Sequence, residues 1–179
     1  MEKKGHADLL AAVGLLKERG VPVRVDLAGD GPLGPSLAEQ VASLGLEDEV
    51  VFRGNVPHEE LVRGMAAREW HAAVLPSVVT GDGELEGIPV SLVEAMACGL
   101  PAVGTDAGGT PELLRDGAGI VVPQGDSKAL AAAIERLAGD PDLRAELGAR
   151  GRERVREAFA ADEVAAALLA RFRDCDLPR

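Results

Sequence analysis

Aromatic residues and positive charge are both scarce in this chain of 179 residues. Tyrosine is absent and the aromatic share is only 2%, so the core has to be built from Ala, Val and Leu. Lys and Arg total 19 against 30 Asp and Glu, which gives a net charge of -11. This balance argues against nucleic acid as the main partner, because affinity for a phosphate backbone comes from clustered cations.

Long apolar runs and cysteine pairs are also missing. No run of about 18 apolar residues occurs, so the sequence predicts no membrane span. The start, MEKKGHADLL, has no apolar segment of the kind that a secretion signal needs. Cys98 and Cys175 are far apart and match no metal or redox spacing. A reduced cytoplasmic protein is the simpler interpretation, and a disulfide stays open as the alternative.

Apolar runs alternate with helical periodicities along the first two thirds of the chain. The apolar runs predict strands over 21–31, 49–54, 71–77, 101–106 and 119–123. Helical spacing predicts helices over 5–19, 35–45, 58–69, 89–99 and 109–117, with Pro89 in the first turn of its helix. Beyond Pro123 the pattern is helical only. Helices are expected to begin at Asp126 or Ser127, at Asp140-Pro141 and at Asp162, the last one running to about Arg173.

This alternation predicts an α/β fold, a Rossmann-like doubly wound parallel sheet with extra C-terminal helices. We expect residues 1–160 to form the domain and residues 161–179 a C-terminal helix. In such sheets ligands bind at the carboxyl ends of the strands, where helix N-termini present unpaired N–H groups that favour phosphate. Four strand ends in this chain carry candidate chemistry.

The strongest of the four is the segment EGIPVSLVE. Glu86 stands just before a predicted helix and Glu94 lies inside it, with seven residues between them. Pro89 has no N–H, which leaves the N–H groups of Val90 and Ser91 free for an anion. Two carboxylates beside a bound anion favour a ligand with hydroxyl pairs, such as a ribose or a sugar. The structural alternative is that Glu86 only favours the helix dipole and that Glu94 is solvated, although the neighbours of Glu94 are apolar.

Three weaker signals follow other strands. Gly29 and Gly31 in AGDGP, and the Gly108-Gly109 pair, permit a close approach of the main chain to a ligand. GNVP after the second strand fits the wall of a base pocket. Each signal also fits a plain turn, and Thr110 fits a helix cap. Two histidines at predicted helix starts fit capping better than ligand contact: His6 and His58.

Together these segments resemble the C-terminal half of the family 4 retaining glycosyltransferases, which have the GT-B fold. The family pattern is a Glu, seven residues and a second Glu in an EAMACGLPVV-like helix and strand. It stands here as EGIPVSLVEAMACGLPAVGTD, followed by GGTPELLRDGAGIVVPQGD. KKGH, AGDGP and FRGNVPHEEL also match in family order, so the resemblance covers residues 2 to about 160. The EGIP variant is most similar to bacterial exopolysaccharide enzymes of the colanic-acid type.

The resemblance implies a domain that binds a UDP-, GDP- or ADP-sugar as donor, with no metal and no other cofactor. It implies Glu94 for the ribose hydroxyls, Glu86 as the catalytic-site carboxylate on the transferred sugar, and Lys4 for the departing diphosphate. It implies backbone contacts to the distal phosphate at Ile88, Val90 and Ser91, to the nucleotide at Gly29 and Gly31, and to the base beside Val56. Because negative charge grows on the departing diphosphate, a fixed cation and N–H dipoles aimed at it lower the barrier.

The chain departs from the family pattern in two places. Ile88-Pro89 stands where an aromatic residue and a glycine are common, which removes one N–H donor. The acceptor-binding N-terminal half is missing, together with the Gly-Arg pair that normally lies upstream of Lys4. We therefore expect an excised domain, or half of a two-chain enzyme, that binds donor with little or no transfer.

For the full-length enzyme the resemblance implies a hexosyltransferase of polysaccharide or glycoconjugate synthesis. It would be cytoplasmic, with a peripheral position at the inner face of the membrane as a further option. A sugar or lipid-linked acceptor would be held by the missing half, toward which the helix of residues 161–179 would pack. Two alternatives stay open: a non-catalytic nucleotide-sugar-binding module, and an epimerase- or phosphorylase-like relative.

Overall fold

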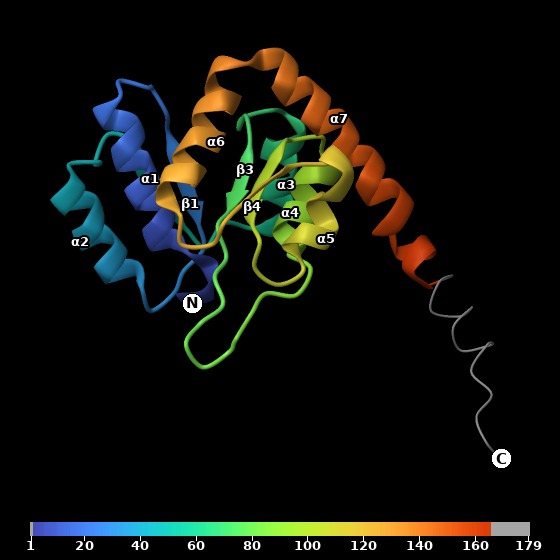
Figure 1. Ribbon diagram of the computed structural model, residues 1–179, viewed down its shortest axis with the longest axis horizontal. Helices are drawn as coiled ribbons and strands as arrows, with labels where there is room; N and C mark the ends of the chain where they lie inside the picture. Colours follow the sequence, from blue (N-terminus) through green and yellow to red (C-terminus); the bar gives the residue numbers. More distant parts are fainter. Residues whose placement is uncertain (1, 166–179) are drawn as a thin grey trace.

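A computed structural model describes residues 2–165 of the chain, and it contains the predicted alternation of strands and helices (Figure 1). The strands are β1 Val25–Ala28, β2 Val50–Gly54, β3 Ala73–Leu75, β4 Ala102–Thr105 and β5 Ile120–Val122. The helices are α1 His6–Glu18, α2 Gly34–Leu44, α3 His58–Ala66, α4 Val90–Ala97, α5 Thr110–Leu114, α6 Ser127–Gly139 and α7 Pro141–Ala158. Short 3₁₀ turns at Glu2–Lys4 and Arg115–Gly117 complete the order.

The strands pair in parallel throughout, as the α/β class requires, but they form two hydrogen-bonded groups. β1 pairs with β2, and β4 lies between β3 and β5. Within residues 2–165 no ladder joins β1 to β3. Side chains link the groups instead, because the indole Nε1 of Trp70, just before β3, donates to Asp26 Oδ2 of β1 at 3.0 Å. β1 is also shorter than the predicted strand, since it begins only at Val25.

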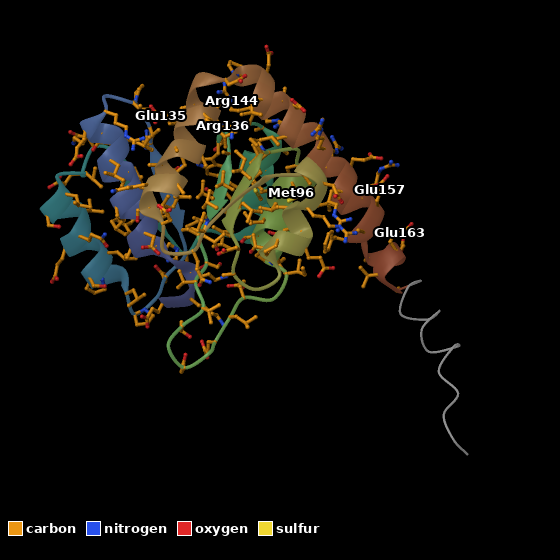
Figure 2. The ribbon with its side chains drawn as sticks, viewed as in Figure 1. Met96, Glu135, Arg136, Arg144, Glu157 and Glu163 are labelled. Carbon is orange, nitrogen blue, oxygen red and sulfur yellow. The ribbon has the colours of Figure 1, made fainter. Side chains whose placement is uncertain are left out.

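The core spans both groups of strands and is aliphatic, as the low aromatic content requires. One cluster of buried residues joins α1, β4 and α6 and includes Leu10, Val103 and Leu130. A second lies among α4, α5 and α7 and includes Met96 and Leu113. Figure 2 shows Met96 enclosed by the ribbon, whereas Glu157 points outward from α7 and Glu163 from the helical residues that follow it.

The helices divide between the two sides of the strands. α1 packs against α2 and α6, and α4 packs against α3, β3 and α7 (Figure 1). α5 lies on β4 and β5. This layering places the N-termini of α1, α3, α4 and α5 just after the carboxyl ends of strands or near them. Within residues 2–165 no helix combines the length and the apolar character needed to cross a membrane.

Two predicted helix starts are confirmed, and an aspartate caps each helix. Asp126 Oδ1 accepts hydrogen bonds from the N–H groups of Lys128 and Ala129 at the start of α6, and Asp140 accepts from Leu143 at the start of α7. Residues 161–165 are helical, and the rest of the helix predicted from Asp162 to Arg173 lies outside the described residues, as does most of 161–179.

Other assignments at the helix starts are wrong, although α3 begins at His58 as predicted. Pro89 is the residue before α4, with extended backbone, and is not part of its first turn. Thr110 does not cap α5, because Gly109 takes the cap position and the Thr110 hydroxyl is buried inside the fold. His6 and His58 are already the first helical residues of α1 and α3, and neither makes a side-chain cap. A capping residue stands just before the helix, and its side chain accepts a hydrogen bond from an N–H of the first turn. These residues do not meet both conditions.

Candidate functional site

The turn after β4 determines where Glu86 lies. The N–H of Gly109 donates to the carbonyl oxygen of Glu86 at 3.2 Å. A Cβ on Gly108, whose φ is +59°, would lie only 1.9 Å from the same oxygen. The Gly108-Gly109 pair therefore leaves room for the backbone of the segment before α4. The main chain that approaches these glycines closely is that of Glu86, and not a ligand.

The Lys3-Lys4 turn lies against the end of β3, and this contact brings Lys4 to Glu86. The N–H of Val78 donates to Lys3 O at 2.9 Å. Gly5 has a φ of +63°, and a Cβ there would lie 1.8 Å from the carbonyl oxygen of Pro76, directly after β3. The backbone at Gly5 thus contacts the end of β3, and this contact sets the position of Lys4.

Lys4 and Glu86, which are 82 positions apart in the chain (86 − 4), form an ion pair in the fold. Lys4 Nζ lies 2.9 Å from Glu86 Oε2, and the exposed fractions of the two side chains are 28% and 16%. Glu86 Oε2 is buried, and the ammonium is at ion-pair distance without the alignment of a hydrogen bond. The pair therefore keeps unused hydrogen-bonding capacity on both partners, since an ammonium has three donors and a carboxylate oxygen two lone pairs.

Glu94, on α4, meets the start of α3. Its Oε1 lies 2.8 Å from Nε2 of His58, and the exposed fractions are 33% for Glu94 and 67% for His58. Because an ionised carboxylate only accepts hydrogen bonds, Nε2 is the donor in this contact. Within residues 2–165, the hydrogen bonds and ion pairs of the Glu94 carboxylate involve Oε1 alone.

The glycine turn after β1 lies against the turn after β2. The N–H of Gly29 donates to Gly54 O at 2.7 Å, and Asp30 Oδ1 lies 3.5 Å from where a Cβ on Gly54 would be. Gly29 has a φ of +123° with open space around its Cα, and Gly31 accepts from the N–H of Gly34. Val56 follows two residues after Gly54 and is partly buried.

The N-terminus of α4 lies between the two carboxylates in the chain and is exposed. Val90 is 67% exposed and Ser91 is exposed as well. The N–H groups of Leu92 and Val93 both bond to Pro89 O, and no residue in 2–165 accepts from the N–H of Ile88, Val90 or Ser91. Free N–H groups at a helix start, with an ammonium nearby, favour an anion such as phosphate.

Two titratable groups near the Lys3-Lys4 turn have shifted pKa values. Burial, with a smaller contribution from the Lys4 ammonium, lowers the pKa of His6 below its ordinary value. The Thr80 hydroxyl, and then the N–H of Glu84, lower the pKa of Asp82 by donating to its carboxylate. Among residues 2–165, His, Cys, Asp and Glu side chains form no group of three or more that could hold a metal ion.

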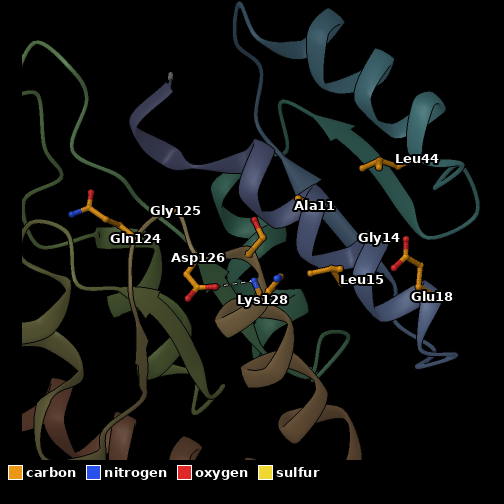
Figure 3. A pocket seen from close by; sticks show the side chains of 10 residues that line it. Ala11, Gly14, Leu15, Glu18, Leu44, Gln124, Gly125, Asp126 and Lys128 are labelled. Atoms are coloured by element: carbon orange, nitrogen blue, oxygen red, sulfur yellow. Dashed lines mark hydrogen bonds between the residues drawn. The ribbon is translucent and has the colours of Figure 1, made fainter.

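Two hollows of the described chain are lined by residues other than the predicted binding residues. One of about 510 Å³ is bounded by α1, the end of α2 and the start of α6, with Leu15, Leu44 and Asp126 in its lining (Figure 3). Another of about 440 Å³ lies between Lys3 and the loop that carries Thr80 and Asp82. Neither is lined by Glu86 or Glu94.

The fold therefore brings the predicted residues together in two groups. Lys4 and Glu86 form one, and Glu94 contacts His58 at the start of α3, two residues after Val56. Within the described chain no hydrogen bond or ion pair links the glycines after β1 to Lys4 or Glu86. Sequence reasoning missed the contact of His58 with Glu94, because no spacing rule connects residues on two different helices.

A family model described as glycosyl transferases group 1 matches residues 1–154 of the chain. The amylovoran biosynthesis glycosyltransferase AmsK of Erwinia amylovora is 40% identical over 144 residues, which are 79% of this chain and 35% of AmsK. The putative colanic acid biosynthesis glycosyltransferase WcaL of Escherichia coli is 41% identical over 162 residues, 88% of this chain and 39% of WcaL. The chain thus spans little more than a third of the length of these relatives.

Solved structures share the fold. The sucrose-phosphate synthase of Thermosynechococcus elongatus superposes with a TM-score of 0.77 at 31% identity, over 97% of this chain and 43% of that one. HepE of Anabaena, in complex with UDP and glucose, superposes with a TM-score of 0.77 at 26% identity, over 95% of this chain and 46% of that one.

Proposed function

The chain belongs to the group 1 glycosyl transferases, and from this premise we propose that it is the donor-binding domain of a retaining hexosyltransferase of polysaccharide or glycoconjugate synthesis. Its ligand is a nucleotide diphosphate sugar, bound at the N-terminus of α4. The acceptor, a sugar or a lipid-linked sugar, is held by the part of the whole enzyme that corresponds to the remaining length of the relatives.

One observation carries this proposal. The exposed start of α4, with free N–H groups, has a carboxylate before it and another within it. The first contacts the N-terminal turn and the second contacts the start of α3. Glu86 is paired with Lys4 at 2.9 Å and Glu94 with His58 at 2.8 Å. This arrangement suits a ligand with an anionic centre and hydroxyl groups at both ends, which is the chemistry of a nucleotide diphosphate sugar.

In this arrangement the N–H groups of Ile88, Val90 and Ser91 bind the distal phosphate. Glu94 accepts hydrogen bonds from the ribose hydroxyls, with the base beside Val56 and the nucleotide close to Gly29 and Gly31. Glu86 accepts from hydroxyls of the transferred sugar through its unused lone pairs. Lys4 donates to the diphosphate while Glu86 remains its counter-ion, since an ammonium has three N–H bonds to donate.

The chemical step follows from where charge develops. As the bond between the anomeric carbon of the sugar and the diphosphate breaks, the acceptor hydroxyl oxygen bonds to that carbon on the same face. The hydroxyl proton passes to the departing phosphate oxygen, on which negative charge grows. The proposal places the Lys4 ammonium and the helix N–H groups beside that position, where they stabilise the transition state more than the ground state. Glu86 positions the sugar on the opposite side of the same segment. In this scheme the Lys4 ammonium and the helix N–H groups stabilise the phosphate charge without a metal ion.

The related HepE crystallised with UDP and glucose supports a nucleotide and a sugar as ligands of this fold at 26% identity. AmsK and WcaL support a place in exopolysaccharide synthesis.

A thermal-shift panel of UDP-, GDP- and ADP-sugars tests the proposal. Any ligand that binds only the folded state raises the melting temperature, by mass action. We expect one base to stand out, and isothermal calorimetry with that donor to give one site per chain. A panel in which no nucleotide or nucleotide sugar shifts the melting temperature at millimolar concentration would overturn the proposed function.

Replacing Glu86 with Gln is expected to reduce discrimination among sugars and to spare the bare nucleoside diphosphate. The substitution removes the acceptor charge on the sugar side and leaves Lys4 without its counter-ion, which keeps or strengthens its hold on the diphosphate. Competition calorimetry with several sugars on one nucleotide measures the change. Asp82→Gln, in the neighbouring loop, is the control for lost negative charge. Equal losses for the nucleotide sugar and the bare nucleotide would show that Glu86 is not on the sugar.

A further inference from the structure

The exposed histidine at the start of α3 has no role in the binding scheme so far. His58 Nε2 donates to Glu94 Oε1 at 2.8 Å, across the packing of α3 against α4. The side chain is 67% exposed, so burial does not explain its orientation. Nor does helix capping, because His58 is inside the first turn of α3 and makes no cap.

The hydrogen bond from His58 engages Oε1 of the Glu94 carboxylate and leaves Oε2 without a partner among the described residues. Glu94 is 33% exposed on a helix, and an unheld glutamate there would sample several rotamers. With Oε1 engaged by the imidazole, Oε2 is available in a single orientation, and Oε1 keeps a second lone pair. A diol donates two hydrogen bonds at once to a carboxylate only when the plane of the two carboxylate oxygens has the matching orientation.

The same histidine directly follows the turn that carries the proposed base contact. His58 is the first residue of α3, and Val56 and Pro57 before it belong to the turn from β2 to α3. A ligand that places its base against Val56 and its ribose on Glu94 therefore contacts two elements that the imidazole joins. The hydrogen bond fixes the distance between the base contact and the ribose contact before the ligand arrives.

Resting on the proposed function, we propose that His58 is a positioning residue: it holds the Glu94 carboxylate in the orientation that receives the vicinal hydroxyls of the ribose. It does not touch the reacting atoms. Its effect is therefore confined to ligands that carry both hydroxyls, and it acts on the nucleoside portion whatever sugar is attached.

Three substitutions of His58 distinguish a positioning role from that of a surface residue without effect on binding. His58→Ala removes the donor and is expected to weaken binding of the preferred nucleoside diphosphate by roughly three- to tenfold, the loss of one charge-assisted hydrogen bond acting through Glu94. His58→Gln places an amide N–H where Nε2 was and restores affinity to within about twofold of the unsubstituted chain. His58→Asn is too short to reach and behaves like the Ala variant. His71→Ala, at another exposed histidine, is the matched control and is expected to change nothing.

Calorimetry on the whole chain measures the affinities for UDP, GDP and ADP. The affinity for the preferred nucleotide is then compared with that for its 2′,3′-dideoxy analogue. Loss of affinity for the parent nucleotide in His58→Ala, with an unchanged affinity for the dideoxy compound and rescue by Gln, supports the proposal. Equal losses for both compounds, or no rescue, would overturn the positioning role and leave the donor site intact. If the unsubstituted chain binds none of the three nucleotides, the proposed function falls and this inference with it.

Discussion

Replacing Glu94 with Gln should weaken nucleoside diphosphate binding by about 1–3 kcal/mol, the contribution of hydrogen bonds to a charged group. The amide is isosteric with the carboxylate and its carbonyl oxygen still accepts from His58, so α3 and α4 keep their packing. What is lost is one acceptor oxygen and the charge that strengthens both ribose bonds. The experiment is calorimetry of the preferred nucleoside diphosphate against the variant.

The matched control is Glu60→Gln, which removes an exposed carboxylate from the first turn of α3 close to the same site. It tests whether lost negative charge alone alters the affinity for an anionic ligand. We expect the Glu60 variant to bind as the unsubstituted chain does, or slightly better. Unchanged affinity in the Glu94 variant would remove this residue from the ribose contact and would contradict the arrangement around α4.

Replacing Gly5 with Ala should lower the free energy of unfolding by about 2–5 kcal/mol. The left-handed backbone at this position, φ +63°, costs an L-residue roughly 1–2 kcal/mol. The added Cβ would also lie 1.8 Å from Pro76 O, so the Lys3-Lys4 turn has to move from the end of β3, at a further cost of about 1–3 kcal/mol for overpacking. Urea unfolding measures the change.

Gly20→Ala is a control in which only the first cost applies. Gly20 also has a positive φ, +71°, but nothing lies within 4 Å of its Cβ position. The difference between the two variants therefore isolates the contact with Pro76. Equal destabilisation would mean that the turn is not held by this contact. We also expect Gly5→Ala to weaken diphosphate binding, because Lys4 moves with the turn.

Much of the fold could be predicted from the sequence because it depends on local periodicity. The apolar runs around Val50, Val74, Val103 and Val121 each contain the strand that was expected there. The caps at Asp126 and Asp140 were predictable for the same reason, since a capping side chain bonds within three residues of itself. Strand lengths and the division into two hydrogen-bonded groups were not, because pairing partners are distant in the chain.

The candidate site divides in the same way. The EGIPVSLVE segment singled out Glu86 and Glu94 through their spacing around a helix start, and the roles proposed for them stay predictions until binding is measured. The partners of the two carboxylates came from 82 and 36 positions away (86 − 4 and 94 − 58). Nothing in the local sequence distinguishes His58 as a partner for Glu94 from His58 as a helix cap.

The sequence by itself determined the α/β class, the order of the elements and the acidic pair beside α4, because each depends on residues that are neighbours along the chain. Only the tertiary structure decided that Lys4 pairs with Glu86, that His58 contacts Glu94 and that Gly5 lies against the end of β3. It also decided that Gly108 admits protein backbone, where ligand access was the other option. These contacts join segments that meet at the carboxyl ends of parallel strands, and that meeting is produced by packing of the whole aliphatic core.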